Sequence, residues 1–304
     1  MKIVTITLNP AYDIHYFTDS LILHKENYMK EAITDCGGKG INVSKVLNSL
    51  NADNTAFVIL GKRNCTAFEN ELNSSFPSHV KLYTDGSIRE NITIHEDNNK
   101  ETRISLDNFE VSSELFEEAK NSISALLSSG DIAEFSGRIP KGISKEDVVE
   151  FLISLKNKGV LIVLDSNSLD ISDIAKIKPW FIKPNEEEIA SLYTNGEYID
   201  GAKKLFEMGC ENIMVTLGKD GCIFVGKDGI FKANAPAITP FSTIGAGDST
   251  IGGFIYAKKM NMPIKEAIAF SLACGSAACL MEGTKPPRKE DILRLSKEIK
   301  VADV

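Results

Sequence analysis

The chain has 304 residues, 43% of them hydrophobic and 25% charged, a balance that supports a buried core and excludes intrinsic disorder as the main state. Its 34 Lys and Arg stand against 42 Asp and Glu, and the resulting formal net charge of −8 excludes a general attraction for nucleic acid or an anionic membrane surface. No apolar run reaches the roughly 18 residues of a membrane span, and the N-terminus lacks the apolar core of a signal peptide, so we expect a cytoplasmic protein that holds anionic ligands by local geometry alone.

Short apolar runs alternate with longer segments of helical spacing along the chain. The predicted strands cover residues 3–8, 56–60, 132–135, 160–165, 180–183 and 213–217. Helices are predicted between most of them, including an apolar stripe from Leu115 to Leu127 and a helix that follows the capping sequence Ser144-x-x-Asp147. Strands separated by helices form parallel sheets with helices on both faces, so the sequence predicts an α/β fold.

Two segments, 11–35 and 87–108, interrupt this rhythm. Apolar and polar residues alternate in them without intervening helical spacing, a pattern typical of antiparallel strands. If the two segments pair with each other, they form a small β-sheet lid over a ligand cleft. The rest of the chain, residues 1–10, 36–86 and 109–304, then forms one large α/β domain.

Residues 36–47 join a glycine-rich turn to an amphipathic helix. Gly37 and Gly38 carry no side chain, so a sugar can approach the backbone closely there. Asn42, in the first helical turn, can exchange hydrogen bonds with sugar hydroxyls, and Lys39 is placed to meet a phosphate. A plain loop with a solvated lysine accounts for the same residues.

Two arginines lie in the predicted lid. Asn91 follows Arg89 by two residues and is therefore expected on the same face of its strand. Guanidinium groups bind phosphate through paired donors, so Arg89 and Arg103 above a cleft favour a substrate that already carries a phosphate. Ordinary exposed strand arginines are the alternative.

Residues 183–188 follow a predicted strand at its carboxyl end, the edge where open α/β sheets bind ligands. Asn185 and Glu188 can orient water and Mg²⁺ near nucleotide phosphates, because Mg²⁺ keeps several waters and needs few direct protein ligands. A solvated helix start is the alternative for the three consecutive glutamates. The turn at 216–221, after the next strand, either lines a nucleotide or forms a glycine-bounded hairpin.

Residues 242–254 form a second glycine-rich turn that leads into a helical pattern. Small residues allow the N–H groups of a helix start to converge on an anion such as a phosphoryl group. Asp248 lies within this turn, where its carboxylate can accept the proton of an attacking hydroxyl. A helix N-cap and a tight turn are the structural alternatives.

In their order and spacing, these segments together resemble the ribokinase-like PfkB carbohydrate kinases across essentially the whole chain. The resemblance rests on Thr7-Leu8-Asn9-Pro10-Ala11-Tyr12-Asp13, Gly37-Gly38-Lys39-Gly40-Ile41-Asn42-Val43, Lys183-Pro184-Asn185 through Glu188, and Thr243-x-Gly245-Ala246-Gly247-Asp248. It implies a large three-layer α/β/α domain with a mostly parallel central sheet and a small β-sheet lid. It also implies ATP as phosphoryl donor, Mg²⁺ as cofactor, a small sugar phosphate as substrate and a homodimer joined through the lids.

The resemblance assigns roles to residues of this chain. The implied catalytic residues are Asp248 as base and Gly245, Ala246 and Gly247 as anion hole. The implied substrate-binding residues are Asp13, Gly37, Gly38, Lys39, Asn42, Arg89, Asn91, Arg103 and Arg138. The implied ATP-binding residues are Lys183, Asn185, Thr216, Gly218 and Gly221, and Glu188 is implied to hold Mg²⁺ through water.

Within the family, the opening motif and the Gly-Lys-Gly-x-Asn-Val run are most similar to the branch that phosphorylates ketohexose phosphates. Arg138 stands where this branch usually has a small hydroxyl residue, and Thr93 stands where its fructose 1-phosphate kinases tend to carry Lys. We therefore expect ATP-dependent phosphorylation of a ketohexose monophosphate to the bisphosphate, with fructose 1-phosphate first and tagatose 6-phosphate or fructose 6-phosphate next. A catalytically idle sugar- or nucleotide-binding regulatory protein and a kinase for unphosphorylated sugars or nucleosides are the alternatives.

Overall fold

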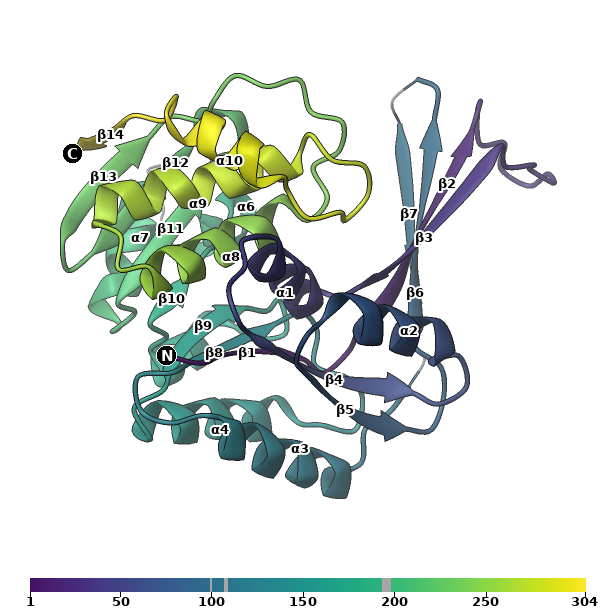
Figure 1. Ribbon diagram of the computed structural model, residues 1–304, viewed down its shortest axis with the longest axis horizontal. Coiled ribbons are helices and arrows are strands. Elements are labelled where there is room, and N and C mark those ends of the chain that lie inside the picture. Colours follow the sequence, from purple (N-terminus) through teal and green to yellow (C-terminus); the bar gives the residue numbers. More distant parts are fainter. Residues whose placement is uncertain (99, 107–108, 193–197) are drawn as a thin grey trace.

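A computed structural model describes residues 1–98, 100–106, 109–192 and 198–304, and within them the chain forms one ten-stranded sheet (Figure 1). The strand order is β14-β13-β12-β11-β10-β9-β8-β1-β4-β5. The strands are β1 (Ile3–Thr7), β4 (Thr55–Gly61), β5 (His79–Thr84), β8 (Ile132–Ser136), β9 (Leu161–Asp165), β10 (Phe181–Ile182), β11 (Asn212–Thr216), β12 (Cys222–Gly226), β13 (Gly229–Ala233) and β14 (Val301–Asp303). In this spatial order, the strands from β11 through β10, β9, β8, β1 and β4 to β5 all pair in parallel. β12, β13 and β14 add an antiparallel edge next to β11.

The mostly parallel sheet predicted from the sequence is confirmed, and the ends of the predicted strands differ from the observed ones by at most one residue. At 180–183 the strand is shorter than predicted at both ends, and only Phe181 and Ile182 are in the ladder. Lys183 therefore starts the loop at the carboxyl edge of the sheet instead of ending the strand. This shift matters for function, because it frees the lysine side chain to face the edge where ligands bind.

Helices cover both faces of the ten-stranded sheet. One face carries α1 (Lys39–Ser49), α2 (Thr66–Ser75), α8 (Ala246–Lys259), α9 (Ile264–Ala278) and α10 (Lys289–Ser296). The other carries α3 (Ser113–Leu126), α4 (Lys145–Asn157), α5 (Ile171–Ile177), α6 (Glu186–Ile189) and α7 (Tyr198–Glu207). Because side chains of a strand alternate between faces, Ile3 packs into the first layer and Val4 into the second. No helix within the described ranges is long and apolar enough to cross a membrane.

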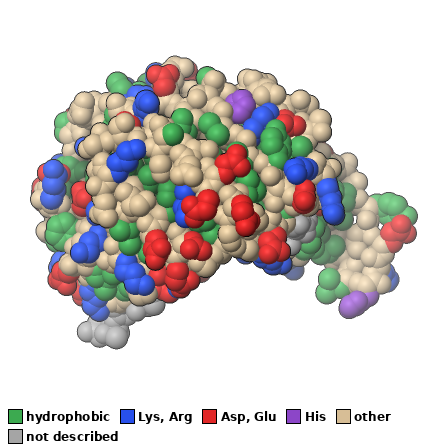
Figure 2. All heavy atoms as spheres, turned by 90° about the horizontal axis from the view of Figure 1, so that it is seen from below, with side chains coloured by type: hydrophobic (Ala, Val, Ile, Leu, Met, Phe, Trp, Pro, Cys, Tyr) green, Lys and Arg blue, Asp and Glu red, His purple; other side chains and the backbone are tan. Residues whose placement is uncertain are grey.

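A separate four-stranded sheet, called the small sheet here, projects from one end of the molecule (Figures 1 and 2). Its strands, in spatial order, are β3 (Glu31–Gly37), β2 (Ala11–Thr18), β6 (Arg89–Glu96) and β7 (Glu101–Ser105). They come from the two predicted lid segments, 11–35 and 87–108, except that β3 continues two residues further, to Gly37. Residues 99, 107 and 108 lie outside the described part.

The predicted antiparallel pairing of the small sheet is only partly right. β2 with β3 and β6 with β7 form antiparallel hairpins, but β2 and β6 pair in parallel. The reason is the chain path: both β2 and β6 leave the main body and both hairpins return to it, so the outgoing strands run in the same direction. The shared outgoing direction places residues at the base of both strands, such as Ala11 and Arg89, side by side.

Candidate active site

A cavity of about 290 Å³ lies where the small sheet meets the carboxyl edge of the main sheet. The main body contributes Thr7, Asn9, Gly38, Lys39, Asn42, Gly137, Arg138, Asn167 and Ile244 to its lining, and the small sheet contributes Asp13, Arg89, Asn91, Ile92, Thr93, Arg103 and Ser105. Among these described lining residues, the cationic side chains are Lys39, Arg89, Arg103 and Arg138, and Asp13 is the one acidic side chain. The cavity is therefore positively charged in a protein whose net charge is −8.

Every predicted substrate-binding residue lines this cavity except Gly37, which packs against the lining residue Asp13. A Cβ atom on Gly37 would overlap the carboxylate of Asp13, so a glycine is needed there to let Asp13 occupy its place. Burial raises the pKa of Asp13, while the hydrogen bond from Asn91 and the charge of Arg89 oppose that rise.

Arg89 and Asn91 share a face of β6, as predicted, and build a polar chain at the base of the small sheet. The Arg89 Nε donates to the Asn9 carbonyl at 3.3 Å, and its Nη1 donates to Asn91 Oδ1 at 2.7 Å. The Asn91 amide then donates to Asp13 Oδ1 at 2.8 Å. Because Arg89 is buried and held at both ends of its guanidinium, its charge has a fixed position in the cavity wall.

The other two arginines of the cavity are exposed. Arg103, on β7, donates from Nη2 to Glu101 at 2.8 Å, and Arg138 lies in the loop after β8. An exposed ion pair such as Arg103–Glu101 contributes little to folding stability, so Arg103 can turn toward a ligand at small cost, and the exposed side chain of Arg138 can do the same. The cavity thus has one fixed arginine and two adjustable ones.

Within the glycine-rich segment 242–254, the turn ends at Gly245 and α8 begins at Ala246. The backbone of Gly245 is left-handed, with φ 76°. Asp248 is the third residue of α8 and is 7% exposed. Its carboxylate accepts a hydrogen bond from the Asn42 amide at 2.8 Å. The N-cap position belongs to Gly245, so the N-cap explanation of Asp248 is wrong.

Asp248 lies behind Asn42, which lines the cavity, and it does not line the cavity itself. Burial and the negative charge of Asp165 raise the pKa of the Asp248 carboxyl to about 6, against the opposing effects of Lys39, Asn42 and Lys183. A carboxyl that titrates near neutrality, at the positive end of a helix, has the properties of a general base for a hydroxyl.

Asp165, which the sequence analysis missed, organises this region. It ends β9, is 8% exposed, and forms an ion pair with Lys39 at 3.0 Å. Burial acts to lower the pKa of Lys39, but the carboxylates of Asp165 and Asp248 outweigh it and the pKa is raised. Lys39 is therefore held as a cation between the cavity and Asp248. The sequence feature that could have indicated Asp165 as a site residue is its position, as an acidic residue, at the carboxyl end of a predicted strand.

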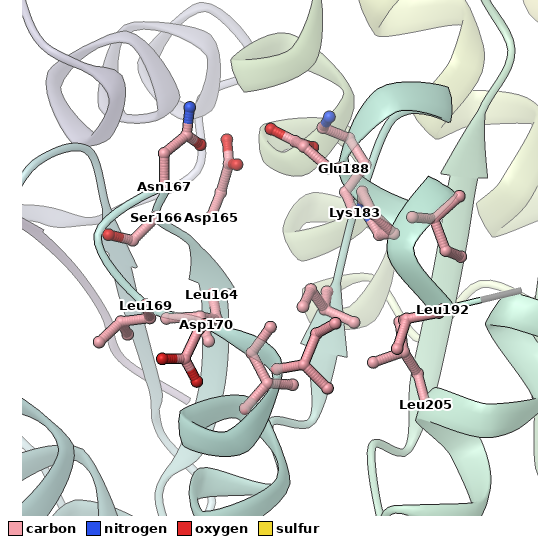
Figure 3. A pocket seen from close by; sticks show the side chains of 15 residues that line it. Leu164, Asp165, Ser166, Asn167, Leu169, Asp170, Lys183, Glu188, Leu192 and Leu205 are labelled. Atoms are coloured by element: carbon pink, nitrogen blue, oxygen red, sulfur yellow. The ribbon is translucent and has the colours of Figure 1, made fainter.

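A second cavity, of about 390 Å³, adjoins the first and shares Asn167 with it. Figure 3 shows Asp165 and Asn167 facing Lys183 and Glu188 across its polar end. The remainder of the lining is mainly apolar and comes from β9, β10 and the helices α5, α6 and α7.

The predicted nucleotide-side residues are only partly brought together. Asn185 and Glu188 cap α6 reciprocally: Glu188 N donates to Asn185 Oδ1 and Asn185 N donates to Glu188 Oε2, each at 2.9 Å. Thr216 pairs with Asn185 through a backbone bridge. Gly218 and Gly221 stand further along, in the turn between β11 and β12, so the hairpin reading of that turn is confirmed. A Cβ on Gly221 would collide with the Ala233 carbonyl, which gives this glycine a structural role as well.

Comparison with known proteins decides the family. A sequence profile described as "pfkB family carbohydrate kinase" matches residues 3–291. The chain belongs to this family. A 1-phosphofructokinase of Haemophilus influenzae is 32% identical over 91% of this chain and 90% of the relative. One from Borreliella burgdorferi is 31% identical over 99% of both chains. The crystal structure of phosphofructokinase-2 from Escherichia coli "in complex with substrates and products" superposes with a TM-score of 0.91 at 22% identity, over 98% of this chain and 99% of that one.

As a pfkB family carbohydrate kinase, the protein is a phosphotransferase that uses ATP, and the start of α8 fits the phosphates of such a donor. The position that a Cβ on Gly247 would take is 3.2 Å from the Lys183 Nζ. The bare backbone of Gly247 and the buried ammonium of Lys183 therefore face the same small space. N–H groups of a helix start together with a lysine form a phosphate cradle.

Proposed function

We propose that the protein transfers the γ-phosphoryl group of ATP to a ketohexose monophosphate and so forms the bisphosphate, with fructose 1-phosphate as the first candidate substrate. The observation that carries this proposal is the cavity under the small sheet, where Lys39, Arg89, Arg103 and Arg138 surround one acidic residue. A cleft for an unphosphorylated sugar has no need of such a concentration of positive charge. The two relatives of 31% and 32% identity, both named 1-phosphofructokinase, favour the same substrate.

The residues of this chain divide the reaction between them. The sugar phosphate binds in the cavity, with Asp13, Asn42 and Asn91 toward its hydroxyls and the arginines toward its phosphate. Asp248 accepts the proton of the attacking hydroxyl as the new oxygen–phosphorus bond forms and the bond to the ADP oxygen breaks. Amides at Gly245, Ala246 and Gly247, with Lys183, stabilise the charge on the transferring group.

Mg²⁺ is proposed as the cofactor, where it would neutralise phosphate charge. Within the described residues no three His, Cys, Asp or Glu side chains gather into a metal cluster, which suits an ion held mostly by water and nucleotide phosphates. Glu188 faces the second cavity beside Lys183 (Figure 3), and it is the carboxylate we expect to hold that ion through water. A cytoplasmic location stays a prediction.

The deciding experiment is a coupled assay of ADP release with ATP and Mg²⁺. Fructose 1-phosphate, tagatose 6-phosphate and fructose 6-phosphate are offered in parallel, with fructose and ribose as unphosphorylated controls. We expect turnover on one of the phosphates that exceeds turnover on either free sugar. Turnover on fructose or ribose that survives replacement of Arg89 and Arg103 would overturn the substrate class. A thermal shift with ATP but no turnover on any sugar would instead indicate a regulatory binding protein.

We further propose that the small sheet, residues 11–35 and 87–108, is a lid and joins two copies of the chain in a homodimer. Exposed hydrophobic side chains lie in the loop between β2 and β3, at Ile22, Leu23 and Tyr28, and on or just after β7, at Ile104 and Leu106. β7 is also an edge strand of the described sheet. Such a surface favours a protein partner. Sedimentation velocity should show a dimer that Leu23→Asp dissociates, whereas Leu293→Asp, at an exposed position on α10, leaves it intact. A monomeric wild type would contradict this proposal.

A further inference from the structure

Glu134 is a buried carboxyl for which the proposed reaction has no use. It lies in the middle of β8, its exposed fraction is 0%, and neither carboxyl oxygen has a hydrogen-bond partner among the described residues. Its neighbours across the sheet are Thr5 on β1 and Val163 on β9. An ionised carboxylate in such a place carries a large desolvation cost that nothing nearby repays in full.

Glu134 lies directly beneath the first turn of α1. A Cβ on Gly40 would stand 3.2 Å from Glu134 Oε2 and 2.5 Å from Thr7 Oγ1. Gly40 is flanked by Lys39 and, two residues on, by Asn42, which holds Asp248. Glu134 thus lies against the backbone that carries Lys39, which forms the ion pair with Asp165, and Asn42, which donates to Asp248.

Two buried hydroxyls lie near Glu134. Thr7 Oγ1 and Ser136 Oγ are unpartnered within the described chain, as are both Glu134 oxygens. A carboxylate only accepts hydrogen bonds, whereas a protonated carboxylic acid also offers a donor to a hydroxyl oxygen. The charged groups that act on Glu134 from the neighbouring elements are Lys39 on α1, Asp165 on β9 and Asp248 on α8, two anions against one cation.

Electrostatics agree with this geometry. Burial, together with the negative charges of Asp165 and Asp248, raises the pKa of Glu134 to about 8, while the nearby Ser136 hydroxyl and Lys39 oppose the rise. At neutral pH the carboxyl is therefore mostly protonated.

We propose that Glu134 is a positioning residue that must carry a proton for full activity. The neutral carboxyl supports the first turn of α1 beneath Lys39 and Asn42. The ionised carboxylate instead adds a negative charge beneath a site that receives two anionic substrates. This inference rests on the proposed sugar-phosphate kinase reaction. It predicts an alkaline loss of activity that originates in a residue touching neither substrate.

The test compares wild type with Glu134→Gln, which keeps the size of the side chain but cannot ionise. Glu150→Gln, at an exposed position on α4, is the matched control. Between about pH 7 and pH 9.5 we expect kcat/KM of wild type and Glu150→Gln to fall about tenfold, the effect of one like charge near the site. Glu134→Gln should retain activity near pH 7 and lose this alkaline decline. An alkaline decline that is identical in all three proteins would overturn the proposal.

A second readout needs no turnover. The unfolded chain ionises Glu134 near the ordinary value of 4.5, whereas the folded protein keeps the proton up to about 8. Folding stability therefore falls as pH rises between these values, and Glu134→Gln removes that loss. The Tm of Glu134→Gln minus that of wild type should grow from about pH 5 to pH 8, and a constant difference would overturn the proposal.

The two hypotheses fail in different ways. If the kinase proposal is wrong, no sugar phosphate is turned over, yet the pH-dependent gap in Tm still appears. If the kinase proposal holds and the Glu134 proposal is wrong, a sugar phosphate is turned over, but either the gap in Tm is absent or the alkaline decline is the same in wild type and Glu134→Gln. Should Glu134→Gln not fold, infrared spectra of ¹³C-glutamate-labelled wild type decide: a protonated carboxyl band that disappears on raising the pH through about 8 supports the proposal, and its absence overturns it.

Discussion

The cavity under the small sheet and the start of α8 each have to receive an anionic group, yet they are built from different materials. The cavity uses four side-chain cations: the buried Arg89, Lys39 in its ion pair with Asp165, and the exposed Arg103 and Arg138. The start of α8 uses backbone N–H groups, the buried Lys183 and a buried carboxyl. Exposed charges are screened by water and salt, whereas buried groups keep their full mutual influence. We therefore expect changes in the cavity to act on substrate affinity and changes at α8 to act on the rate of the chemical step.

The largest expected effect is at Asp248. Asp248→Asn keeps the hydrogen bond with Asn42 within reach but removes the base, so kcat should fall about 100-fold or more with little change in the KM of the sugar phosphate. The coupled ADP assay measures both, with Asp200→Asn at an exposed position on α7 as control.

Stability separates loss of the base from loss of the fold. The pKa of Asp248 is raised in the folded protein, so the unfolded chain releases this proton first and stability declines as pH rises from the ordinary value toward about 6. Above that pH the asparagine variant is relieved of this cost and its Tm should equal or exceed that of wild type. A wild-type kcat in the variant would contradict the role of Asp248.

A smaller effect is expected at Arg89, in the cavity under the small sheet. Arg89→Met removes a fixed, charge-assisted donor, and the KM of the sugar phosphate should rise about 10- to 100-fold while the KM of ATP stays unchanged. Arg103→Met removes an exposed cation already paired with Glu101, so its KM should rise only a few-fold. Equal effects from the two arginines would show that burial does not distinguish them.

The pH profile tests whether α8 depends on its buried charges. Because Asp248 must be ionised to accept a proton, kcat/KM should fall about tenfold for each pH unit below about 6. Asp165→Asn removes a negative charge that raises the pKa of Asp248, so this acidic limb should move to lower pH. Asp200→Asn, at the exposed position on α7, serves as control and should leave the limb in place.

The same contrast explains how far the sequence could be read. Glycines before helices, the two arginines of the predicted lid and the strand-and-helix rhythm are local patterns, and the structure places them as predicted. Asp165, Glu134 and the need for glycine at Gly37 depend on which side chains meet across β1, β8, β9 and β2. Strand register and burial determine these side-chain contacts, and a short sequence motif predicts neither. The parallel pairing of β2 and β6 was missed for the same reason, because it follows from the path of the chain.

The smallest expected effect on overall rate concerns Arg138, and it bears on which sugar phosphate fits. Arg138 is exposed, lies in the loop after β8, and lines the cavity opposite the arginines of the small sheet. Arg138→Ser should change kcat for the best substrate by only a few-fold, since an exposed cation contributes about 1 kcal/mol or less. It should nevertheless alter the ratio of kcat/KM among fructose 1-phosphate, tagatose 6-phosphate and fructose 6-phosphate, because fructose 1-phosphate carries its phosphate at the opposite end of the sugar from the two 6-phosphates. Unchanged ratios with an unchanged Tm would mean that the fixed Arg89 selects the substrate and the exposed cation only attracts it.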